Sequence, residues 1–159
     1  MKIKRILFPT DFSDRSAAAL DYASNLAASF GATLHIVYVD DLGDLVAQSA
    51  YVYPSFIAAA DRSEMKAQLE GTKPTIPNVA YVHHFVEGEP TARICALAEK
   101  EQIDLIVMSS HGRVGLSRLA MGSAAESVLR HASCPVLIVK QPSAEHINAT
   151  TDVVACVHA

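Results

Sequence analysis

The sequence contains no cluster of basic residues and no long apolar run. Its 159 residues include 13 Lys and Arg against 17 Asp and Glu, which gives a formal net charge of −4 at pH 7. A nucleic-acid-binding surface or a polybasic membrane patch needs clustered positive charge, so the composition argues against both. A membrane-spanning helix needs about 18 consecutive apolar residues, and no uninterrupted run reaches that length. The N-terminal apolar stretch, Ile6–Phe8, is far shorter than the core of a signal peptide, so a first strand is expected there.

Cysteine is also scarce. The three cysteines, Cys95, Cys134 and Cys156, are odd in number and scattered, and none lies in a C-x-x-C motif or a metal-binding spacing. This usage suits a reducing compartment, so a cytoplasmic protein is expected. Cys95 and Cys134 are expected to act as small buried apolar side chains.

The remaining composition is that of one folded domain. Hydrophobic residues make up 50% of the chain and charged residues 19%, which excludes general disorder. Strands are predicted over residues 4–9, 33–39, 79–86, 103–108 and 135–140, and helices over residues 13–30, about 55–69, from 90 onward, and 123–131. Strict alternation of strands and helices predicts right-handed β-α-β crossovers and a parallel sheet with helices on both faces.

Capping residues mark several of the predicted helix ends. Ser13 is placed to cap the first helix, and Gly31 is placed to end it. Pro90 stands near the first position of its helix, where a missing amide proton costs nothing. The segment Ser123-Ala124-Ala125-Glu126 matches the S-x-x-E capping box, which predicts a helix start at Ser123.

Two segments are harder to assign. Pro54 prevents one continuous helix through residues 40–71, so a loop or short helix is expected before the helix at 55. Tyr51 and Tyr53 either pack this irregular segment onto the sheet or form a partner-binding patch or lid. The tail, residues 141–159, is either a loose extension or an extra edge strand. We therefore divide the chain into a domain at residues 1–140 and a C-terminal extension at 141–159.

His83 and His84 are adjacent on a predicted strand. Successive side chains of a strand point to opposite faces, so these two cannot form one metal site together. A surface or partly buried pair is expected instead.

The first candidate for ligand binding is Asp11, directly after the first strand. In open parallel sheets, ligands bind beyond the carboxyl ends of strands where the winding direction reverses, which points to the segments after the first and fourth strands. Asp11 either caps the following helix and places its charge near the positive helix end, or accepts a hydrogen bond from a base or ribose.

The second candidate is the glycine-containing segment after the fourth strand, residues 109–123, with one helical turn expected at 116–120. Glycine allows close approach of a ligand to the main chain, and amides in such a turn, together with a helix start, attract anions. The segment matches neither the Walker A motif nor the dinucleotide fingerprint. His111 either donates to a phosphate or stabilises the turn, and Arg113 is the nearest cation.

With these residues in view, the chain resembles the universal stress protein family over about residues 2–140. The matching stretches are KIKRILFPTDFS, VEGEP and IDLIVMSSHGRVGLSRLAMGSAAESVLRHASCPVLIVK. The resemblance implies an α/β fold with a single open, doubly wound, parallel five-stranded sheet in the order 3-2-1-4-5, similar to the adenine-nucleotide alpha-hydrolases. It also implies a homodimer formed by fifth strands, Pro135 to Lys140, pairing across a twofold axis. Such pairing would cover an apolar edge strand.

The resemblance also implies a nucleotide site. The family's nucleotide-binding motif is glycine, two residues, glycine, nine residues, glycine, then serine or threonine. Gly112, Gly122 and Ser123 match it, and Ser109 replaces the first glycine. The base and ribose would be lined by Pro9, Thr10, Asp11 and Val39. The phosphates would be held by Ser109, Ser110, His111, Gly112, Arg113, Val114, Gly115, Gly122, Ser123, Ala124 and Ala125.

These observations predict a cytoplasmic stress-response regulatory protein that binds ATP, accompanied by Mg²⁺, and is not primarily an enzyme. One alternative is a structural or signalling homodimer of the same fold that binds no nucleotide, because Ser109 places a Cβ where a phosphate or ribose needs close approach. A second alternative is a slow ATP hydrolase. Its candidate groups would be Asp11, His111 and Arg113, and no pair of them has a diagnostic spacing.

Overall fold

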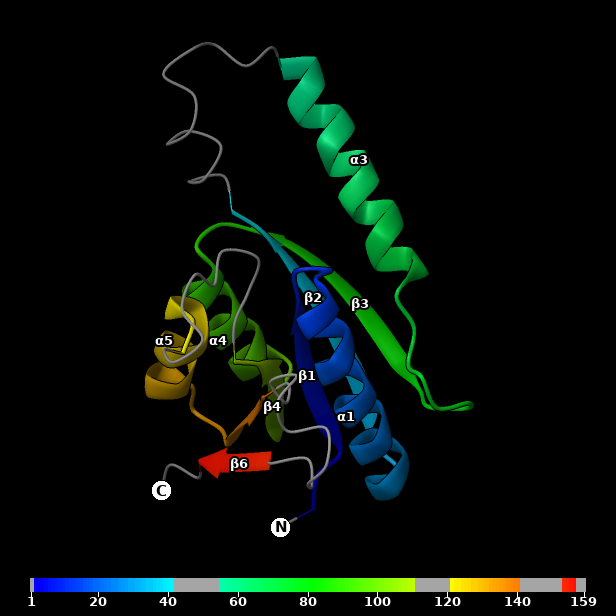
Figure 1. The fold of residues 1–159 in the computed structure, drawn as a ribbon, viewed down its shortest axis with the longest axis vertical. Helices are drawn as coiled ribbons and strands as arrows, with labels where there is room; N and C mark the ends of the chain where they lie inside the picture. The colour runs from blue at the N-terminus through cyan, green and yellow to red at the C-terminus, as the bar shows by residue number, and fades with distance from the viewer. Residues whose placement is uncertain (1, 42–54, 111–120, 141–152, 157–159) are drawn as a thin grey trace, which may run out of the picture.

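The computed structural model describes residues 2–41, 55–110, 121–140 and 153–156. Figure 1 shows the arrangement of their helices and strands. The strands are β1 (Arg5–Thr10), β2 (Thr33–Asp40), β3 (Tyr81–Glu87), β4 (Leu105–Ser109), β5 (Val136–Val139) and β6 (Val153–Cys156). The helices in these ranges are α1 (Asp14–Phe30), α3 (Ser55–Gly71), α4 (Pro90–Lys100) and α5 (Ser123–His131).

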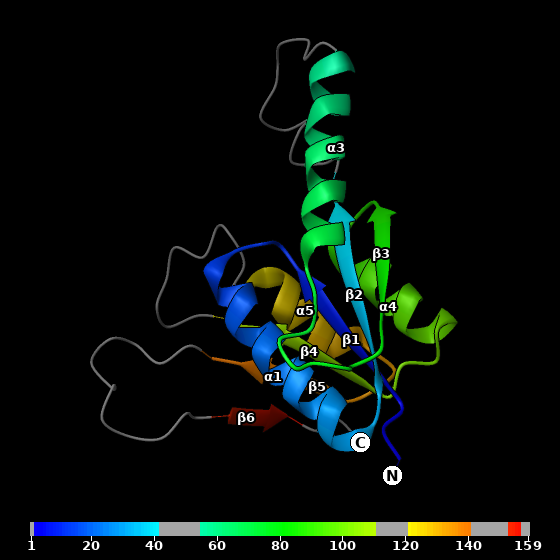
Figure 2. The same cartoon turned by 90° about the vertical axis from the view of Figure 1, so that its right-hand side faces the viewer.

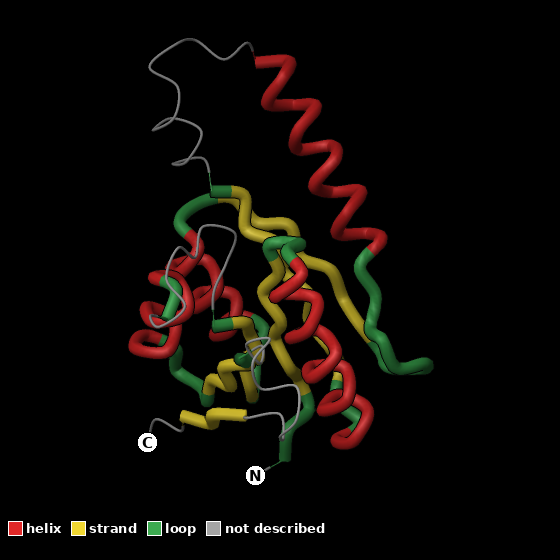
Figure 3. Tube along the Cα trace, in the orientation of Figure 1, coloured by secondary structure: helices red, strands yellow, loops and turns green. Residues whose placement is uncertain are grey.

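The strands form one sheet in the order β3-β2-β1-β4-β5-β6. The first five are parallel, which confirms the predicted fold class and strand order. β6 joins β5 in the antiparallel direction, so it extends the predicted sheet by one strand. Since all five parallel strands run the same way, their carboxyl ends and the loops that follow β1 and β3 lie at one end of the sheet (Figure 3).

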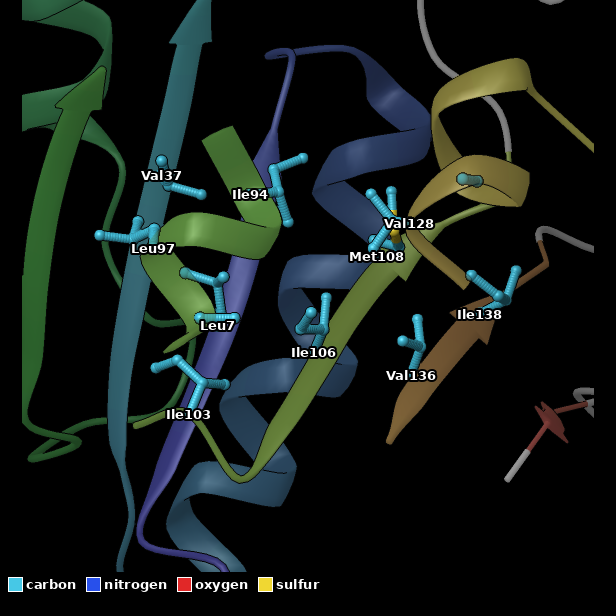
Figure 4. Packing of buried hydrophobic residues seen from close by; sticks show 12 residues of the cluster. Leu7, Val37, Ile94, Leu97, Ile103, Ile106, Met108, Val128, Val136 and Ile138 are labelled. Carbon is cyan, nitrogen blue, oxygen red and sulfur yellow. The ribbon is translucent and has the colours of Figure 1, made fainter. Parts of the chain in front are cut away.

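Two apolar clusters separate the sheet from its helical layers. On one face, Leu7, Val37 and Ile106 are fully buried against residues of α4 and α5 (Figure 4). Ile94, Leu97 and Ala98 are buried and form the inner face of α4. The other face packs against α1 and the C-terminal part of α3. Complete burial of a side chain the size of Ile106 contributes about 1.5–3 kcal/mol, so these clusters fix the sheet between its helices.

The helix α3 extends further from the sheet than the others. Its N-terminal part reaches past the carboxyl ends of β2 and β3 in both views (Figures 1 and 2). Leu69, near its C-terminal end, is 3% exposed and anchors α3 in the second cluster. Within the described residues, no helix combines the length and the apolar character that crossing a bilayer requires.

The predicted ends of α1 and the predicted start of α4 are confirmed. Ser13 Oγ accepts a hydrogen bond from the amide of Ser16, and Gly31 adopts the left-handed conformation, φ 62°, that ends α1. Pro90 opens α4, and the Glu89 carboxylate accepts hydrogen bonds from the amides of Thr91 and Ala92.

The capping box predicted for α5 does not form, although the helix begins at Ser123 as predicted. Gly122 is the capping residue, in an extended conformation, and no side-chain cap hydrogen bond is present there. Ser123 is therefore already inside the helix. Its expected partner, Glu126, instead accepts a 2.7 Å hydrogen bond from Arg130, one turn further along α5.

The structure also corrects the expectation that the fifth strand is an edge. Val136 to Val139 pair with Cys156 to Val153, so the outer side of β5 is covered by the chain's own tail. Of the two alternatives left open for the tail, the extra edge strand is the one observed for residues 153–156.

Candidate functional site

The turn between β1 and α1 is organised by hydroxyl and carboxylate oxygens. Thr10 Oγ1 accepts hydrogen bonds from the amide of Phe12 at 3.1 Å and from Ser16 Oγ at 2.9 Å. Asp11 Oδ1 accepts from both the amide and the hydroxyl of Ser13, at 3.1 and 2.7 Å. Asp11 therefore does not cap α1 itself, as one alternative had it; it holds Ser13, the residue that does.

Phe12 gives this turn its shape. Its φ of 61° lies in the left-handed region, which costs a residue other than glycine about 1 kcal/mol or more. The ring stacks on Tyr38 at 4.9 Å between centroids, and Tyr38 contacts Phe85 at 5.6 Å. This aromatic row links the turn to β2 and β3 and offsets the backbone strain.

Pro9 and Val39 lie on the opposite face of the sheet from this row. Pro9 pairs in register with Val37, which belongs to the cluster covered by α4 and α5, and Val39 packs against the same cluster. Thr10 pairs with Tyr38 and shares the α1 face. The four residues predicted to line the base and ribose thus lie at one end of the sheet but not on one face.

The segment after β4 is closed at its base by two backbone hydrogen bonds. The amide of Ser110 donates to the carbonyl oxygen of Val139 at 3.0 Å, and the amide of Gly122 donates to the carbonyl oxygen of Ser110 at 2.8 Å. The two ends of the loop are thus held together at the carboxyl edge of the sheet. The Gly122 amide is used within the protein, so it is not available to a phosphate.

The first turn of α5 offers the amides that the site needs. The first intrahelical hydrogen bond runs from the Glu126 amide to the Gly122 carbonyl oxygen at 3.0 Å. The amides of Ser123, Ala124 and Ala125 precede it and have no carbonyl partner one turn earlier. Ser123 and Ala124 are exposed, and the positive end of the helix dipole lies here. This arrangement can bind an anion.

Several predicted residues lie outside the described part of the chain. His111, Gly112, Arg113, Val114 and Gly115 fall there, as do the helical turn expected at 116–120 and both Tyr51 and Tyr53. Their assignment remains a prediction from the sequence.

A cavity of about 430 Å³ lies beside the β1–α1 turn, between α1 and the C-terminal end of α3. Thr10 is the one residue of the predicted nucleotide site that lines it. The full lining is Phe8, Thr10, Phe12, Ser13, Ser16, Ala17, Leu20, Gln68, Gly71, Thr72 and Lys73. No residue of α5 is in this lining, so the cavity is separate from the proposed phosphate site at the first turn of α5.

Arg62 is a residue of the site's rim that the sequence did not reveal. Its guanidinium bonds Asp40 Oδ2 at 2.9 Å and approaches Glu87 Oε1 at 3.4 Å. Asp40 and Glu87 end β2 and β3, so Arg62 ties α3 to the carboxyl ends of both strands. No local sequence motif joins residues 22 positions apart, which is why the contact was missed.

The histidines confirm the prediction that His83 and His84 point to opposite faces. His83 bonds the carbonyl oxygen of Thr72 at 2.7 Å, whereas His84 Nε2 lies 3.0 Å from His35 Nδ1. Both are partly buried, as expected. Within the described ranges, no group of three or more histidine, cysteine or acidic side chains is arranged to hold a metal ion.

Comparison with known proteins decides the family. The sequence profile of the universal stress protein family matches residues 2–140. The chain belongs to this family. Universal stress protein MJ0531 of Methanocaldococcus jannaschii is 38% identical over 144 residues, which cover 89% of this chain and 85% of that protein.

Solved structures of universal stress proteins share the fold. The structure of MJ0577, also from M. jannaschii, superposes with a TM-score of 0.78 at 27% identity and covers 91% of this chain and 100% of its own. A crystal structure of a universal stress protein in complex with cAMP superposes with a TM-score of 0.58 at 26% identity, over 88% of this chain and 98% of its own. At least one protein of this fold therefore binds an adenine nucleotide.

Proposed function

We propose that this universal stress protein binds an adenine nucleotide, ATP, at the carboxyl ends of β1 and β4. The observation that carries the proposal is the first turn of α5, where the amides of Ser123, Ala124 and Ala125 lack intrahelical partners beside two exposed small residues. Small side chains let a phosphate reach the main chain, and the helix dipole favours its charge. The cAMP complex of a related structure supports an adenine nucleotide as the ligand class.

The replacement of the first motif glycine by Ser109 is compatible with this site. Ser109 is the last residue of β4 and pairs in register with Val139, and it is not among the described residues with positive φ. A strand conformation is open to any residue, so the backbone does not require glycine here. The Ser109 Cβ then affects only the space next to the ligand, and this space decides between ATP binding and the non-binding alternative.

The base and ribose are assigned to Pro9, Thr10, Asp11 and Val39, with the phosphates extending through Ser109, Ser110 and the residues from His111 to Gly115 toward α5. Pro9 and Val39 supply an apolar contact on the α5 face, where a base can lie against the end of the sheet. We assign Mg²⁺ to the triphosphate and water, since the described residues offer no cluster of metal ligands.

The role we infer is regulatory binding in a cytoplasmic stress response, not rapid turnover. A fast nucleotide hydrolase needs a positioned base and cations at the γ-phosphate, and the first turn of α5, Ser123 to Glu126, contains an acidic residue and no basic one. We expect ATP turnover below about one per second, the low end of ordinary enzymes.

We further propose that the domain at residues 1–140 forms a homodimer through β5, and that residues 141–159 are an extension of it. Fifth strands that pair antiparallel across a twofold axis would extend one sheet across two copies.

Titration of the purified protein with Mg-ATP in a calorimeter tests the proposed site. Saturable binding at one nucleotide per chain is expected, and nucleotide released from gently purified protein should be ATP, ADP or AMP. A protein that carries no nucleotide and gives no heat with ATP at millimolar concentration would instead support the non-binding homodimer. Turnover well above one per second would overturn the regulatory-binding proposal in favour of an enzyme.

A further inference from the structure

The outer edge of β5 is occupied by the chain's own C-terminal strand. Four consecutive residue pairs, from Val136 with Cys156 to Val139 with Val153, join β5 and β6 in antiparallel register. The whole length of β5 is used in this pairing, since β5 contains four residues. The family profile matches residues 2–140, so β6 lies outside the part of the chain that defines the family.

A second copy of this chain would need the same edge in the same direction. When two identical strands pair across a twofold axis perpendicular to the sheet, they run antiparallel. β6 also runs antiparallel to β5, so it takes both the place and the direction of the partner's β5. One edge of a strand can form one ladder of hydrogen bonds, and the two pairings therefore exclude each other.

The covalent connection favours β6 over a second copy. β5 ends at Val139 and β6 begins at Val153, so residues 140–152 join the two strands. Segments joined through so few residues meet at an effective concentration on the order of millimolar. A second copy at micromolar concentration meets the edge about a thousand times less often, so it must gain much more contact energy than β6 to displace it.

We propose that β6 is an internal competitor for the β5 edge, and that it keeps the chain monomeric until it is released. The partner excluded by β6 is a second copy of this chain, paired through its own β5. The inference rests on the proposed homodimer through β5. Release of the tail exposes the row of backbone donors and acceptors on β5, and two released copies satisfy these groups by pairing with each other.

Two consecutive prolines in β6 test the proposal in the full chain. Alternate residues of an antiparallel strand direct their amides toward the neighbour, so Val154→Pro with Ala155→Pro must remove one donor that faces β5. The matched control is Val154→Thr with Ala155→Thr, which keeps both amides and a residue type suited to strands. Circular dichroism and thermal unfolding establish that each variant is folded.

Sedimentation velocity over a range of protein concentrations gives the result. The parent and the threonine variant are expected to be monomers at micromolar concentration. The proline variant is expected to be a dimer, with a dimer dissociation constant at least tenfold lower than that of the parent. A parent that is already as dimeric as the proline variant overturns the internal competition while leaving the homodimer in place. If all three chains stay monomeric, both the homodimer and the competition are wrong.

The opposite change in oligomeric state is also informative. If the parent dimerises and the proline variant does not, β6 pairs with β5 of another copy, and the competition within one chain is overturned. Amide hydrogen exchange on the dilute parent provides a second measurement. Protection of residues 136–139 together with 153–156 in the monomer supports the proposal, and rapid exchange in both segments contradicts it.

Discussion

Gly122 has a backbone conformation that other residues also adopt, with φ −62° and ψ 145°. Glycine is therefore not required there by the backbone, and a Gly122→Val protein should fold. The new side chain would stand before the amides of Ser123 and Ala124 and block a phosphate. We expect calorimetry to show an ATP affinity at least tenfold weaker, which corresponds to about 1.4 kcal/mol.

The control for this prediction is Gly122→Ala, whose single methyl group should weaken ATP binding less than valine does. Because valine is a poor N-cap residue, thermal unfolding of the Gly122→Val variant is measured as well. Its free energy of unfolding is expected to be lower by about 1 kcal/mol. Undiminished ATP affinity in the valine variant would argue against phosphate binding at the first turn of α5.

Asp11 combines a structural role with the proposed ligand contact, and two substitutions separate them. Asp11→Asn retains an oxygen for Ser13, whereas Asp11→Ala loses both hydrogen bonds and should lower the free energy of unfolding by about 1 kcal/mol. We expect both variants to bind ATP more weakly, with an altered preference between ATP and GTP. If both bind the two nucleotides as the parent does, Asp11 does not contact the base or ribose.

The thiol of Cys134 is predicted to be unreactive in the folded protein. Burial raises the pKa of Cys134 to about 11, with smaller contributions from Cys95 and Asp104. The reactive thiolate is then rare at pH 8 and accumulates only as the pH approaches 11. Burial also raises the pKa of Cys95, in agreement with the apolar role expected for both, although each is half-buried rather than fully buried.

Alkylation followed by mass spectrometry checks this prediction residue by residue. At pH 8, Cys134 should react slowly in the native protein and at least tenfold faster in denaturant, where its pKa returns to its ordinary value. Equal rates in the two states would mean that the side chain is not held in the cluster beneath α4 and α5.

At the scale of elements, patterns within the sequence predicted most of the fold because they depend on neighbouring residues. Apolar runs and caps located β1, β2, α1 and α5 to within about one residue. The fourth strand begins at Leu105 and not at Ile103, because the Asp104 carboxylate accepts hydrogen bonds from the amides of Lys4 and Arg5 before the sheet pairing starts. The third strand begins at Tyr81, the first residue that pairs with β2, and not at Val79.

Contacts between distant elements could not be predicted in the same way. The stack of Phe12 on Tyr38 and the pairing of His35 with His84 depend on the register of β1, β2 and β3, which no single segment determines. The tail remained undecided for the same reason. An apolar stretch of four residues becomes a strand only when another strand accepts its hydrogen bonds, and β5 does so here.

The attachment of α3 is a further property of elements. Arg62 joins α3 to β2 and β3, and the Asp40 side chain in this contact is only 10% exposed. Replacing Arg62 leaves that carboxylate without its cation, so Arg62→Gln should lower the free energy of unfolding by about 1–2 kcal/mol. Urea unfolding measures the loss, and limited proteolysis should show faster cleavage within α3.

A matched control is Arg130→Gln, which removes the ion pair to Glu126 on α5. Both side chains of that pair are largely exposed, at 71% and 50%, so the expected loss is below about 0.5 kcal/mol. If the two substitutions have the same small effect, Arg62 does not hold α3 to the sheet.

At the scale of the whole molecule, the two imidazoles between β2 and β3 make global stability depend on pH. Burial lowers the pKa of His35, and the adjacent His84 lowers it further. Burial also lowers the pKa of His84. The other groups acting on these rings are Glu101, which raises both pKa values, and Arg5, Lys100 and His83, which lower one or the other. The folded pair thus stays neutral at a pH where an unfolded histidine binds a proton.

The sign of the pH effect follows from this difference. Above the ordinary histidine pKa of 6.5, both states are neutral and the full stability is present; as the pH falls below 6.5, the unfolded chain gains protons first and stability is lost. Between pH 7.5 and 5.5, the parent should therefore lose more free energy of unfolding in urea than a variant with His35→Gln and His84→Gln. If the variant with both histidines replaced loses as much free energy of unfolding as the parent, the proton uptake occurs elsewhere in the molecule.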